Sequence, residues 1–487
     1  MTPSDQKRAG GAGASAPAEF QRLSDHVGTC TKCGFCQPNC PIFRATGREA
    51  NVARGKVSLY RNMIDERLSL GPEVTDAFGN CLLCRACKDN CFPAIRTDDI
   101  VVSFRHAYAE RFGRGFVQRR IFRSLLPRPR LMRALVWVIW RARRTGVDAI
   151  LRRTGLLGMI NPKLERAFEL GARKPGRLLT SRLRRRRSAP AAGRPVVGYW
   201  ISCGYNYVLP EVGEATVRVL ERLGYAVEVL DNACCGIAAY GYGDLEAAAG
   251  LARENLRRLG DIERFEAIVS ECGSCSGHLK EYAHLLSSDA KWSAAAERLQ
   301  GKVRSFSEFV AEHGGVAALT GGEAGLASGA AGGPPVVVTY HDPCHLGRRY
   351  QNVVEQPRAI LRALPGVHFQ EMAEADSCCG AAGTYGILHP ETSAAIIGRK
   401  MAFAGATGAS IVVTECPSCM MQLEFGARKA GLSMSVLSTS QMCDGAVAAG
   451  AISFPQTSTV GSTDVTETRT VEDGGNRNTT GGVDGHD

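Results

Sequence analysis

The sequence has no run of apolar residues long enough to cross a membrane. A spanning helix needs roughly 18–20 consecutive apolar residues, and the most apolar stretch, 131–140 (LMRALVWVIW), is short and contains Arg133. That stretch is typical of a core helix, a partner-docking helix or an interfacial helix. Residues 1–20 are rich in Ala, Gly, Ser and Pro and include no apolar segment of the kind found in signal peptides. We therefore expect a cytoplasmic protein.

Motifs for several common chemistries are also missing. No G-x-G-x-x-G run follows a predicted strand, and Gly241-Tyr-Gly243 does not extend into one. No Ser-His-Asp constellation and no phosphate-binding loop stand out. We expect neither flavin nor NAD in this chain, so any hydride chemistry must occur on a separate protein.

Acidic residues are scarce in one segment. The chain of 487 residues has a net charge of +11, but residues 111–194 contain 24 Lys and Arg against 3 Asp and Glu. A segment of this kind suits anionic lipid, an acidic protein partner or nucleic acid, and it is equally typical of a solvated helical surface. Because no nucleic-acid reader motif accompanies the charge, we expect no nucleic acid partner.

Cysteine is abundant, and 18 of the 19 cysteines fall into four motifs. Two are short runs with C-x2-C-x2-C-x3-C spacing: Cys30, Cys33, Cys36 and Cys40, then Cys81, Cys84, Cys87 and Cys91. Two are longer sets of five: Cys203, Cys234, Cys235, Cys272 and Cys275, then Cys344, Cys378, Cys379, Cys416 and Cys419. Thiolates are soft ligands that suit redox-active iron. Clustered C-x2-C spacing favours metal binding over a disulfide framework.

The short runs have the spacing of two-cluster bacterial ferredoxins, in which the fourth cysteine of each run ligates the other cluster. This pattern predicts two [4Fe–4S] clusters. One would be held by Cys30, Cys33, Cys36 and Cys91, and the other by Cys81, Cys84, Cys87 and Cys40. Pro41 follows the first run as the pattern requires, whereas Phe92 intervenes before Pro93 in the second. A pair of zinc knuckles is the alternative, but zinc sites usually use two pairs of ligands.

The longer sets belong to an internal repeat. Four cysteines of the first set recur 144 residues later, and the leading cysteine recurs 141 residues later. Short Val- and Ile-rich runs recur with them: 196–202 matches 336–341, and 267–271 matches 411–415. Each run ends at or near a cysteine, which is typical of buried parallel strands that deliver ligands at their carboxyl ends. Stretches 211–223 and 247–259 read as helices.

These patterns predict a mixed α+β and α/β protein. We expect disorder over 1–18, a helical two-cluster ferredoxin-type module over 19–110, a basic helical connector over 111–194, and α/β domains over 195–313 and 334–450. A Gly- and Ala-rich loop, 314–333, joins the two α/β domains. The tail, 451–487, is predicted to be disordered.

Both long sets match the cysteine-rich CCG pattern, here Cys234-Cys235-Gly236 and Cys378-Cys379-Gly380 followed by C-x2-C. Over roughly residues 25–445 the chain resembles iron–sulfur subunits that join a ferredoxin module to two CCG domains. These are the glycolate oxidase iron–sulfur subunit, the lactate-utilisation iron–sulfur protein, the anaerobic glycerol-3-phosphate dehydrogenase C subunit and the heterodisulfide reductase catalytic subunit. The stretches 30–36, 81–87, 125–133 and 378–385 are most similar to the glycolate oxidase subunit.

The resemblance implies one or two further iron–sulfur clusters at the CCG motifs. Hydroxy-acid dehydrogenase subunits often lack some CCG cysteines, whereas both sets are complete here. Two complete sets of CCG cysteines are more similar to heterodisulfide reductase, whose non-cubane clusters cleave a disulfide. If this chain is a disulfide reductase, the ten CCG cysteines would be catalytic. Adjacent cysteines favour a bridging or open cluster. A zinc site, a redox disulfide and buried core cysteines are the alternatives for these motifs.

Polar residues beside the motifs are candidates for hydrogen bonds to thiolates: His341, Asp342, His345, Glu271 and Glu415. Helix capping and surface exposure are equally consistent with them. Cys443 lies outside every motif and is predicted to be structural.

The resemblance favours an iron–sulfur electron-transfer subunit of a 2-hydroxy-acid dehydrogenase complex. Such a subunit would take electrons from a flavin-containing dehydrogenase subunit and pass them to a quinone or other acceptor, with peripheral contact to the inner face of the membrane through residues 111–194. The alternative is a heterodisulfide reductase-like subunit. In both cases the chain is part of an oxidoreductase.

Overall fold

The structure is a computed structural model, which describes residues 18–146, 154, 159, 162–170, 177–184, 193–316 and 335–445. Of the disorder predicted over 1–18 and 451–487, all except residue 18 lies outside these residues, as does most of the predicted loop 314–333. Residue 18 already belongs to a helix. No helix in the described part of the chain has both the length and the apolarity to cross a bilayer.

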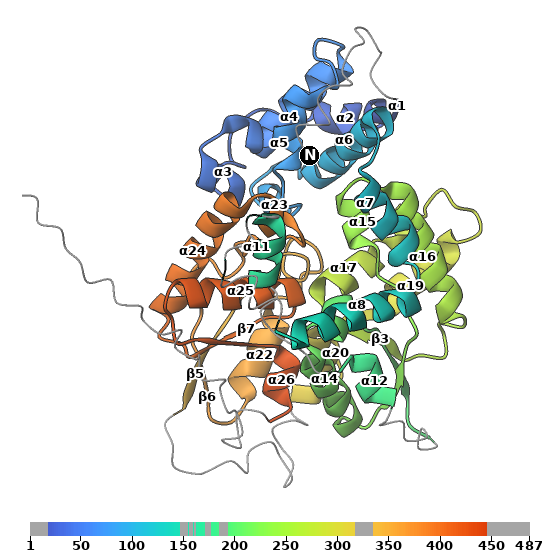
Figure 1. Ribbon diagram of the computed structural model, residues 1–487, viewed down its shortest axis with the longest axis vertical. Helices are drawn as coiled ribbons and strands as arrows, with labels where there is room; N and C mark the ends of the chain where they lie inside the picture. Colours follow the sequence, from blue (N-terminus) through green and yellow to red (C-terminus); the bar gives the residue numbers. More distant parts are fainter. Residues whose placement is uncertain are drawn as a thin grey trace, which may run out of the picture. The chain divides into compact units, whose positions relative to one another are not determined.

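The N-terminal module is helical. It comprises α1 (Ala18–Gln21), α2 (Ser24–Gly28), α3 (Pro41–Thr46), α4 (Ala53–Ile64), α5 (Thr75–Gly79) and α6 (Thr97–Phe112), with 3₁₀ turns at Glu49–Asn51, Pro72–Val74 and Ala86–Lys88 (Figure 1). Its core is aromatic. The rings of Phe78 and Phe104 stack with centroids 4.0 Å apart, and Phe20 lies 4.3 Å from Tyr60. Offset aromatic packing of this kind joins α4, α5 and α6.

The described parts of the basic connector are helical. They form α7 (Phe116–Arg120), a π-helical turn (Ile121–Leu125), α8 (Pro129–Arg144), α11 (Pro162–Leu170) and α12 (Leu179–Arg184). Pro129 and Pro162 stand at helix starts, where the missing proline N–H is tolerated. Helix α12 packs against the first α/β domain, where Leu179 and Leu183 are buried.

The first α/β domain contains a parallel sheet in the order β2-β1-β3-β4. Its elements are β1 (Val196–Tyr199), α13 (Cys203–Tyr207), α14 (Pro210–Arg222), β2 (Ala226–Val229), α15 (Ile237–Gly241), α16 (Leu245–Leu259), β3 (Ala267–Ser270), α17 (Gly273–Lys280), α18 (Tyr282–Leu285), α19 (Ser293–Lys302), β4 (Val303–Ser305) and α20 (Phe306–Glu312). Strand β3 is buried throughout. Its Ala-Ile-Val-Ser sequence fits a strand covered on both faces.

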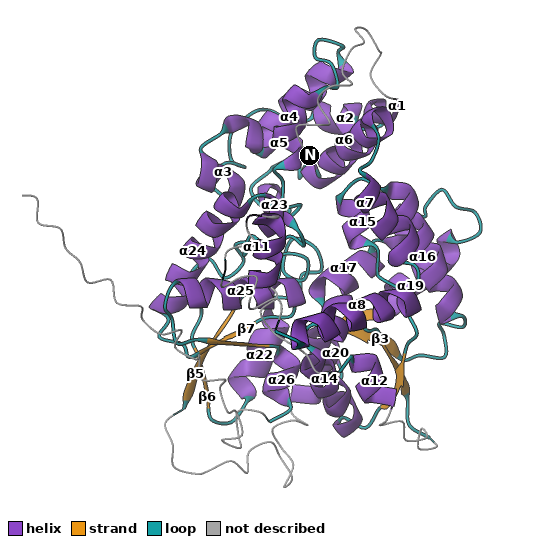
Figure 2. Cartoon of the chain, in the orientation of Figure 1, coloured by secondary structure: helices purple, strands orange, loops and turns teal. Residues whose placement is uncertain are grey.

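The second α/β domain repeats this topology, with a parallel sheet in the order β6-β5-β7-β8. Its elements are β5 (Val336–Tyr340), α22 (Glu355–Ala363), β6 (Val367–Phe369), α23 (Tyr385–Leu388), α24 (Pro390–Ala406), β7 (Ile411–Val413), α25 (Pro417–Lys429), β8 (Ser435–Leu437) and α26 (Thr439–Cys443). The short strands are surrounded by helices in both domains (Figure 2). The predicted repeat and parallel sheets are confirmed.

The last helix of each repeat begins with the same cap. Ser305 and Ser438 each accept a hydrogen bond from the backbone N–H three residues on, and Glu308 and Gln441 bond back to the cap. Such a capping box satisfies two otherwise unpaired N–H groups.

The two repeats pack through equivalent helices. Helix α14 contacts α26, and α22, the counterpart of α14, contacts α20, the counterpart of α26. Arg218 of α14 forms an ion pair with Asp444 at the end of α26. The same pair of helices is therefore in contact whichever repeat supplies the first of them, as expected for two repeats related by a local two-fold axis.

Close backbone approach joins the N-terminal module to the first repeat. Gly243 has a φ of +74°, and a Cβ there would lie 2.5 Å from the backbone nitrogen of His106. Beside it, the Arg105 guanidinium donates to the carbonyls of Gly241 and Phe78. Only glycine combines this conformation with this proximity.

Substituting Gly243→Ala should lower the thermal unfolding midpoint, because the new methyl group meets backbone atoms at a strained φ. Gly250→Ala is the matched control: Gly250 is inside α16, and a Cβ added there would have nothing within 4 Å. Replacing this mid-helix glycine should stabilise by about 0.5–1 kcal/mol. Unfolding of anaerobically purified protein measures both. Equal midpoints for Gly243→Ala and wild type would contradict the close approach.

Candidate iron–sulfur centres

The two short cysteine runs share a backbone conformation. In each run the residues before and after the second cysteine have positive φ: Lys32 (58°) and Gly34 (89°) in the first, Leu83 (54°) and Arg85 (57°) in the second. Successive left-handed residues coil the loop tightly. The same loop shape therefore arises twice from different sequences, and it brings the thiols of each run together.

The first predicted ligand set is gathered in one place. Cys30, Cys33, Cys36 and Cys91 line a single cavity, together with Cys87 of the other set. The backbone N–H of Phe35 lowers the pKa of Cys33, the exposed member of the set. Burial raises the pKa of Cys36. The fourth cysteine of the second run thus lies beside the first three of the first run.

The second predicted set is also gathered. Burial raises the pKa of Cys40 to about 11, and the charges of Cys84 and Cys81 act in the same direction. Burial likewise raises the pKa of Cys87, with Cys84, Cys81 and Cys40 contributing. Cys40 also caps α3, where its Sγ accepts from the Phe43 N–H at 3.5 Å. Its position before Pro41 directs its thiol toward the second run.

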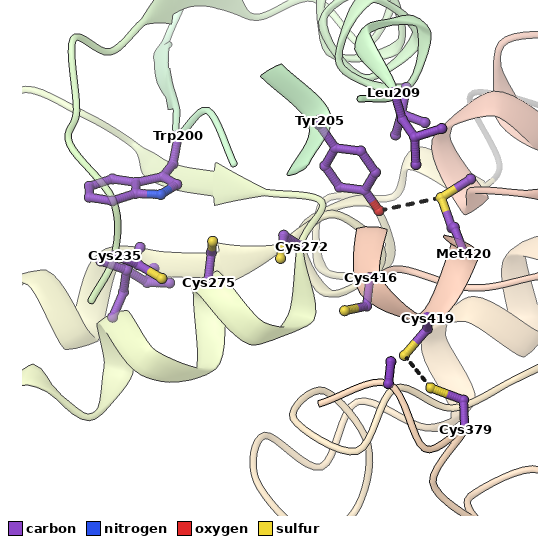
Figure 3. Close-up of a cluster of buried hydrophobic side chains, with 14 of the residues drawn as sticks. Trp200, Tyr205, Leu209, Cys235, Cys272, Cys275, Cys379, Cys416, Cys419 and Met420 are labelled. Carbon is purple, nitrogen blue, oxygen red and sulfur yellow. Dashed lines mark hydrogen bonds between the residues drawn. The ribbon is translucent and has the colours of Figure 1, made fainter. Parts of the chain in front are cut away.

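The ten CCG thiols form one continuous series across both repeats. Neighbouring thiols lie close enough to shift one another's pKa values in the order Cys203, Cys234, Cys235, Cys275, Cys272, Cys416, Cys419, Cys379, Cys378 and Cys344. The Cys379 and Cys419 sulfurs lie 3.4 Å apart. Figure 3 shows the central members of the series, with Cys272 facing Cys416 where the repeats meet. Metal binding by these thiols stays a prediction.

The second cysteine of each adjacent pair has the same surroundings. Hydrogen bonds from Cys234 and then Cys275 lower the pKa of Cys235, and the Ile237 N–H adds to the effect. Hydrogen bonds from Cys378 and then Cys419 lower the pKa of Cys379, with the Ala381 N–H contributing. The glycines that come next, Gly236 and Gly380, have φ of +97° and +80°. This turn lets the amide after each glycine face the thiolate.

The two glutamates that precede the C-x2-C pairs are buried, and their carboxylates accept hydrogen bonds from hydroxyl groups. Tyr199 donates to Glu271 at 2.6 Å, and the hydroxyl of Ser307 donates to Glu415. Burial raises the pKa of Glu271 to about 8 and that of Glu415 to about 7. Both carboxyl groups therefore form hydrogen bonds with the protein around the cysteines and help to hold the surrounding strands and helices in place.

The residues flanking Cys344 have three different positions. Asp342 forms a buried, two-pronged ion pair with Arg358 at 2.9 and 2.8 Å. His345 contacts the Ser274 hydroxyl at 3.1 Å, and that hydroxyl lies 3.6 Å from the Cys416 sulfur. His341 is fully buried, with a ring nitrogen within 4.8 Å of the Cys379 and Cys419 sulfurs. Burial, followed by the charge of Lys400, lowers the pKa of His341 to about 3.

The N-terminal module meets the second repeat at a thiol contact. Cys84 and Cys378 belong to one buried cluster, and the nearby Cys378 thiol, with burial, raises the pKa of Cys84. Ion pairs surround the contact, Arg44 with Glu374 at 2.8 Å and Arg349 with Asp89 at 2.6 Å. A cysteine of the second ferredoxin-type set therefore adjoins the CCG series directly.

Arg85, which follows this thiol, joins three parts of the chain. Its guanidinium donates to Asp98 of the N-terminal module at 2.7 Å and to Glu281 of the first repeat at 3.1 Å. It also lies 3.5 Å from the ring centroid of Tyr350 in the second repeat. We did not single out Arg85 from the sequence, because nothing local distinguishes it from other arginines.

The far end of the CCG series borders a surface pocket. Cys203, the exposed member of the ten, and Cys234 line it with Tyr207, Asn232 and the start of α8. Along the rest of α8 the large apolar side chains Leu131, Leu135, Trp137, Val138 and Ile139 are exposed. Arg130, Arg141 and Arg144 are exposed on the same helix. Of the roles considered for residues 131–140, a core helix is therefore wrong.

Replacing Arg85 should destabilise the chain strongly. Its side chain is 7% exposed and that of Asp98 is 2% exposed, so Arg85→Ala leaves the buried Asp98 carboxylate with only the longer, 3.6 Å ion pair to Arg96. Loss of the shorter pair should cost up to about 3–5 kcal/mol. The control, Arg48→Ala, breaks the exposed pair with Asp76 and should change stability by less than about 1 kcal/mol. Thermal unfolding compares the variants, and equal effects would refute the joining role of Arg85.

Comparison with known proteins agrees with this arrangement. Family models match as a 4Fe-4S dicluster domain over residues 26–95, a glycolate oxidase iron-sulfur subunit linker region over 113–170 and a cysteine-rich domain over 197–280 and 338–424.

Three relatives illustrate the similarity. The chain is 30% identical to a probable glycolate oxidase iron-sulfur subunit of Bacillus subtilis (strain 168), over 86% of this chain and 93% of the relative. It is 26% identical to the glycolate oxidase iron-sulfur subunit of Escherichia coli (strain K12), over 82% and 90%. It is also 30% identical to lactate utilization protein A of Oceanobacillus iheyensis, over 50% and 93%. The chain belongs to the family of glycolate oxidase iron–sulfur subunits.

Proposed function

We propose that this chain is the electron-transfer subunit of a complex that oxidises a 2-hydroxy acid of the glycolate or lactate kind. Electrons come from a separate flavin-containing subunit and leave to a quinone. The observation that carries the proposal is the unbroken sequence of thiol contacts from Cys84, through Cys378 and the Cys416–Cys272 junction, to Cys203. A subunit that only stores electrons has no need of such continuity.

The residues fit iron–sulfur clusters. Soft thiols are grouped in two sets of four and two sets of five, and amide N–H groups face several of them, as thiolate ligands require. One [4Fe–4S] cluster is assigned to Cys30, Cys33, Cys36 and Cys91, and the second to Cys40, Cys81, Cys84 and Cys87. The two CCG sets are assigned one cluster each. When bound, these groups supply one-electron transfer.

The chain itself contributes positioning and shielding. The left-handed loops hold each short run around its centre, and Arg85 holds the module against both repeats. Burial of Cys272, Cys275, Cys416 and Cys419 keeps water from the centre of the series. A low-dielectric path with few solvent contacts needs little reorganisation when charge moves.

Disulfide reduction is the second candidate function, and the complete sets of five cysteines favour it. A disulfide substrate must reach the sulfur or iron at which it reacts. The thiols that meet between the repeats, Cys272 and Cys416, are each 3% exposed. Their burial favours electron transfer over disulfide cleavage at the junction.

The pocket beside Cys203 is the place assigned to the acceptor. It lies at the end of the thiol series opposite the N-terminal module, and its wall includes Pro129, Met132 and Arg133 of α8. Four of the five exposed apolar residues of α8, all except Trp137, recur at i, i+4, i+7 and i+8 from Leu131, and arginines accompany them. This pattern is typical of a helix lying in the interface of an anionic membrane, where a lipophilic quinone is dissolved.

Glycolate or lactate should reduce the iron of the complete complex, purified without oxygen together with its flavoprotein, and the visible absorbance of the clusters should decrease. Acetate, which has no 2-hydroxyl group to oxidise, should leave the absorbance unchanged. Absence of a co-purifying flavoprotein together with no response to any 2-hydroxy acid would overturn the proposal. Rapid oxidation of a reduced dye by a disulfide, lost in Cys379→Ala, would favour the second function instead.

The membrane contact predicts co-flotation with vesicles that contain anionic lipid. Binding should weaken as salt screens the arginines, yet part of it should persist because apolar side chains insert. Leu135→Glu/Val138→Glu should abolish the salt-resistant part. Phe92→Glu, which alters a fully exposed aromatic residue of the N-terminal module, is the matched control and should bind like wild type. Unchanged flotation of the α8 variant would exclude this surface.

A further inference from the structure

The position just after the first strand of each sheet carries a different aromatic side chain in the two repeats, an indole in the first and an imidazole in the second. Val197 pairs with Ala267 in the first sheet, as Val338 pairs with Ile411 in the second. Counting along each strand makes Trp200 the counterpart of His341.

The backbone supports this equivalence. The Trp200 N–H donates to the Val269 carbonyl at 2.9 Å, and the His341 N–H donates to the Val413 carbonyl at 2.9 Å. Figure 3 shows the Trp200 ring beside Cys235 in the first repeat. In the second repeat the same place, beside Cys379, is occupied by an imidazole.

His341 is placed as a ligand would be. Its side chain is fully buried, and one ligand atom from each of His341, Cys379 and Cys419 lies within 4.8 Å of the others. Neither ring nitrogen forms a well-aligned hydrogen bond. The Ala375 carbonyl is near enough to raise the pKa of the ring slightly against the effect of burial.

The charged groups around the ring do not pair with it. The carboxylate of Asp342, its neighbour in sequence, is bound by Arg358. The Lys400 ammonium donates to the carbonyls of Glu374 and Ala375. The imidazole is therefore a buried polar group whose natural partners are occupied.

Simple packing does not explain a histidine at this position. The first repeat shows that this place in the fold accepts a large ring, so an apolar or indole side chain would fill it. A buried polar atom without a partner destabilises the folded protein. This loss of stability is avoided if an atom between the imidazole and the two thiols binds the lone pair of the ring nitrogen.

We propose that His341 is a nitrogen ligand of the iron–sulfur cluster in the second repeat, bound to iron alongside Cys379 and Cys419, and that the first repeat has no equivalent ligand. The inference rests on the proposed function, because it requires a cluster at the second CCG motif. The ring nitrogen opposite the iron then faces the Ala375 carbonyl, as the second nitrogen of a metal-bound histidine often faces a backbone carbonyl.

The ligand gives the two CCG centres different properties. An imidazole is neutral, so it adds no negative charge to the cluster, and histidine ligation is associated with higher reduction potentials than thiolate ligation alone. The second-repeat centre, which adjoins Cys84, is therefore the CCG centre with the higher potential. The first-repeat centre, beside Trp200, has only thiolate ligands.

Pulsed electron paramagnetic resonance on protein labelled with ¹⁵N only in histidine tests the ligand directly. The reduced protein should show strong isotropic coupling to one histidine nitrogen. His341→Trp, which installs the counterpart residue of the first repeat, should lose the coupling. His278→Gln, which alters a buried histidine of the first repeat whose Nε2 also forms no hydrogen bond, is the matched control and should keep it.

Two further measurements keep the test decisive. If His341→Trp does not fold, His341→Ala supplied with ¹⁵N-imidazole should regain the coupling. Iron analysis of wild type and of Cys379→Ala shows whether the second repeat holds a cluster at all. No iron dependent on Cys379 would refute the proposed function, whereas iron with no histidine coupling, or coupling that survives in His341→Trp, would overturn the ligand alone.

Discussion

The contact between Cys272 and Cys416 is the constraint on which the arrangement depends. Each cysteine follows the carboxyl end of a central parallel strand, β3 or β7, and the local two-fold relation of the repeats turns these ends toward one another. The Gly273 N–H donates to the Glu415 carbonyl at 2.7 Å, which locks the two loops together. Two five-cysteine motifs that would be separate sites in isolated domains thereby become one series.

Similar folds in the two repeats support different surroundings for the same cysteine motif. The second repeat adjoins Cys84 and contains His341 and Lys400. At the matching positions the first repeat has Trp200 and Leu256, and its outer cysteine opens to a pocket. One centre is thus suited to exchange electrons with the ferredoxin-type module, and the other with a molecule from outside. The direction of flow follows from the donor and acceptor that the complex supplies.

Much of this organisation could be predicted from the sequence because it depends on local patterns. Cysteine spacing identified all four motifs, and the recurrence of short Val- and Ile-rich runs identified two parallel sheets. The contacts between parts could not be predicted in this way. Arg85 meets Glu281 and Tyr350, and Cys84 meets Cys378, across hundreds of residues of sequence. Trp200 and His341 each precede the leading cysteine of their repeat by three residues, but it is the strand register that shows their equivalence in the fold.

The most direct test of a continuous series is magnetic interaction between centres. Electron paramagnetic resonance of the fully reduced wild-type protein should show broadened signals, because the centre held by Cys84 and that held by Cys378 are adjacent. Cys378→Ser, which alters the second-repeat side of the contact, should sharpen the signal of the N-terminal module. Wild-type spectra equal to the simple sum of isolated clusters would show that the module and the repeats do not form one path.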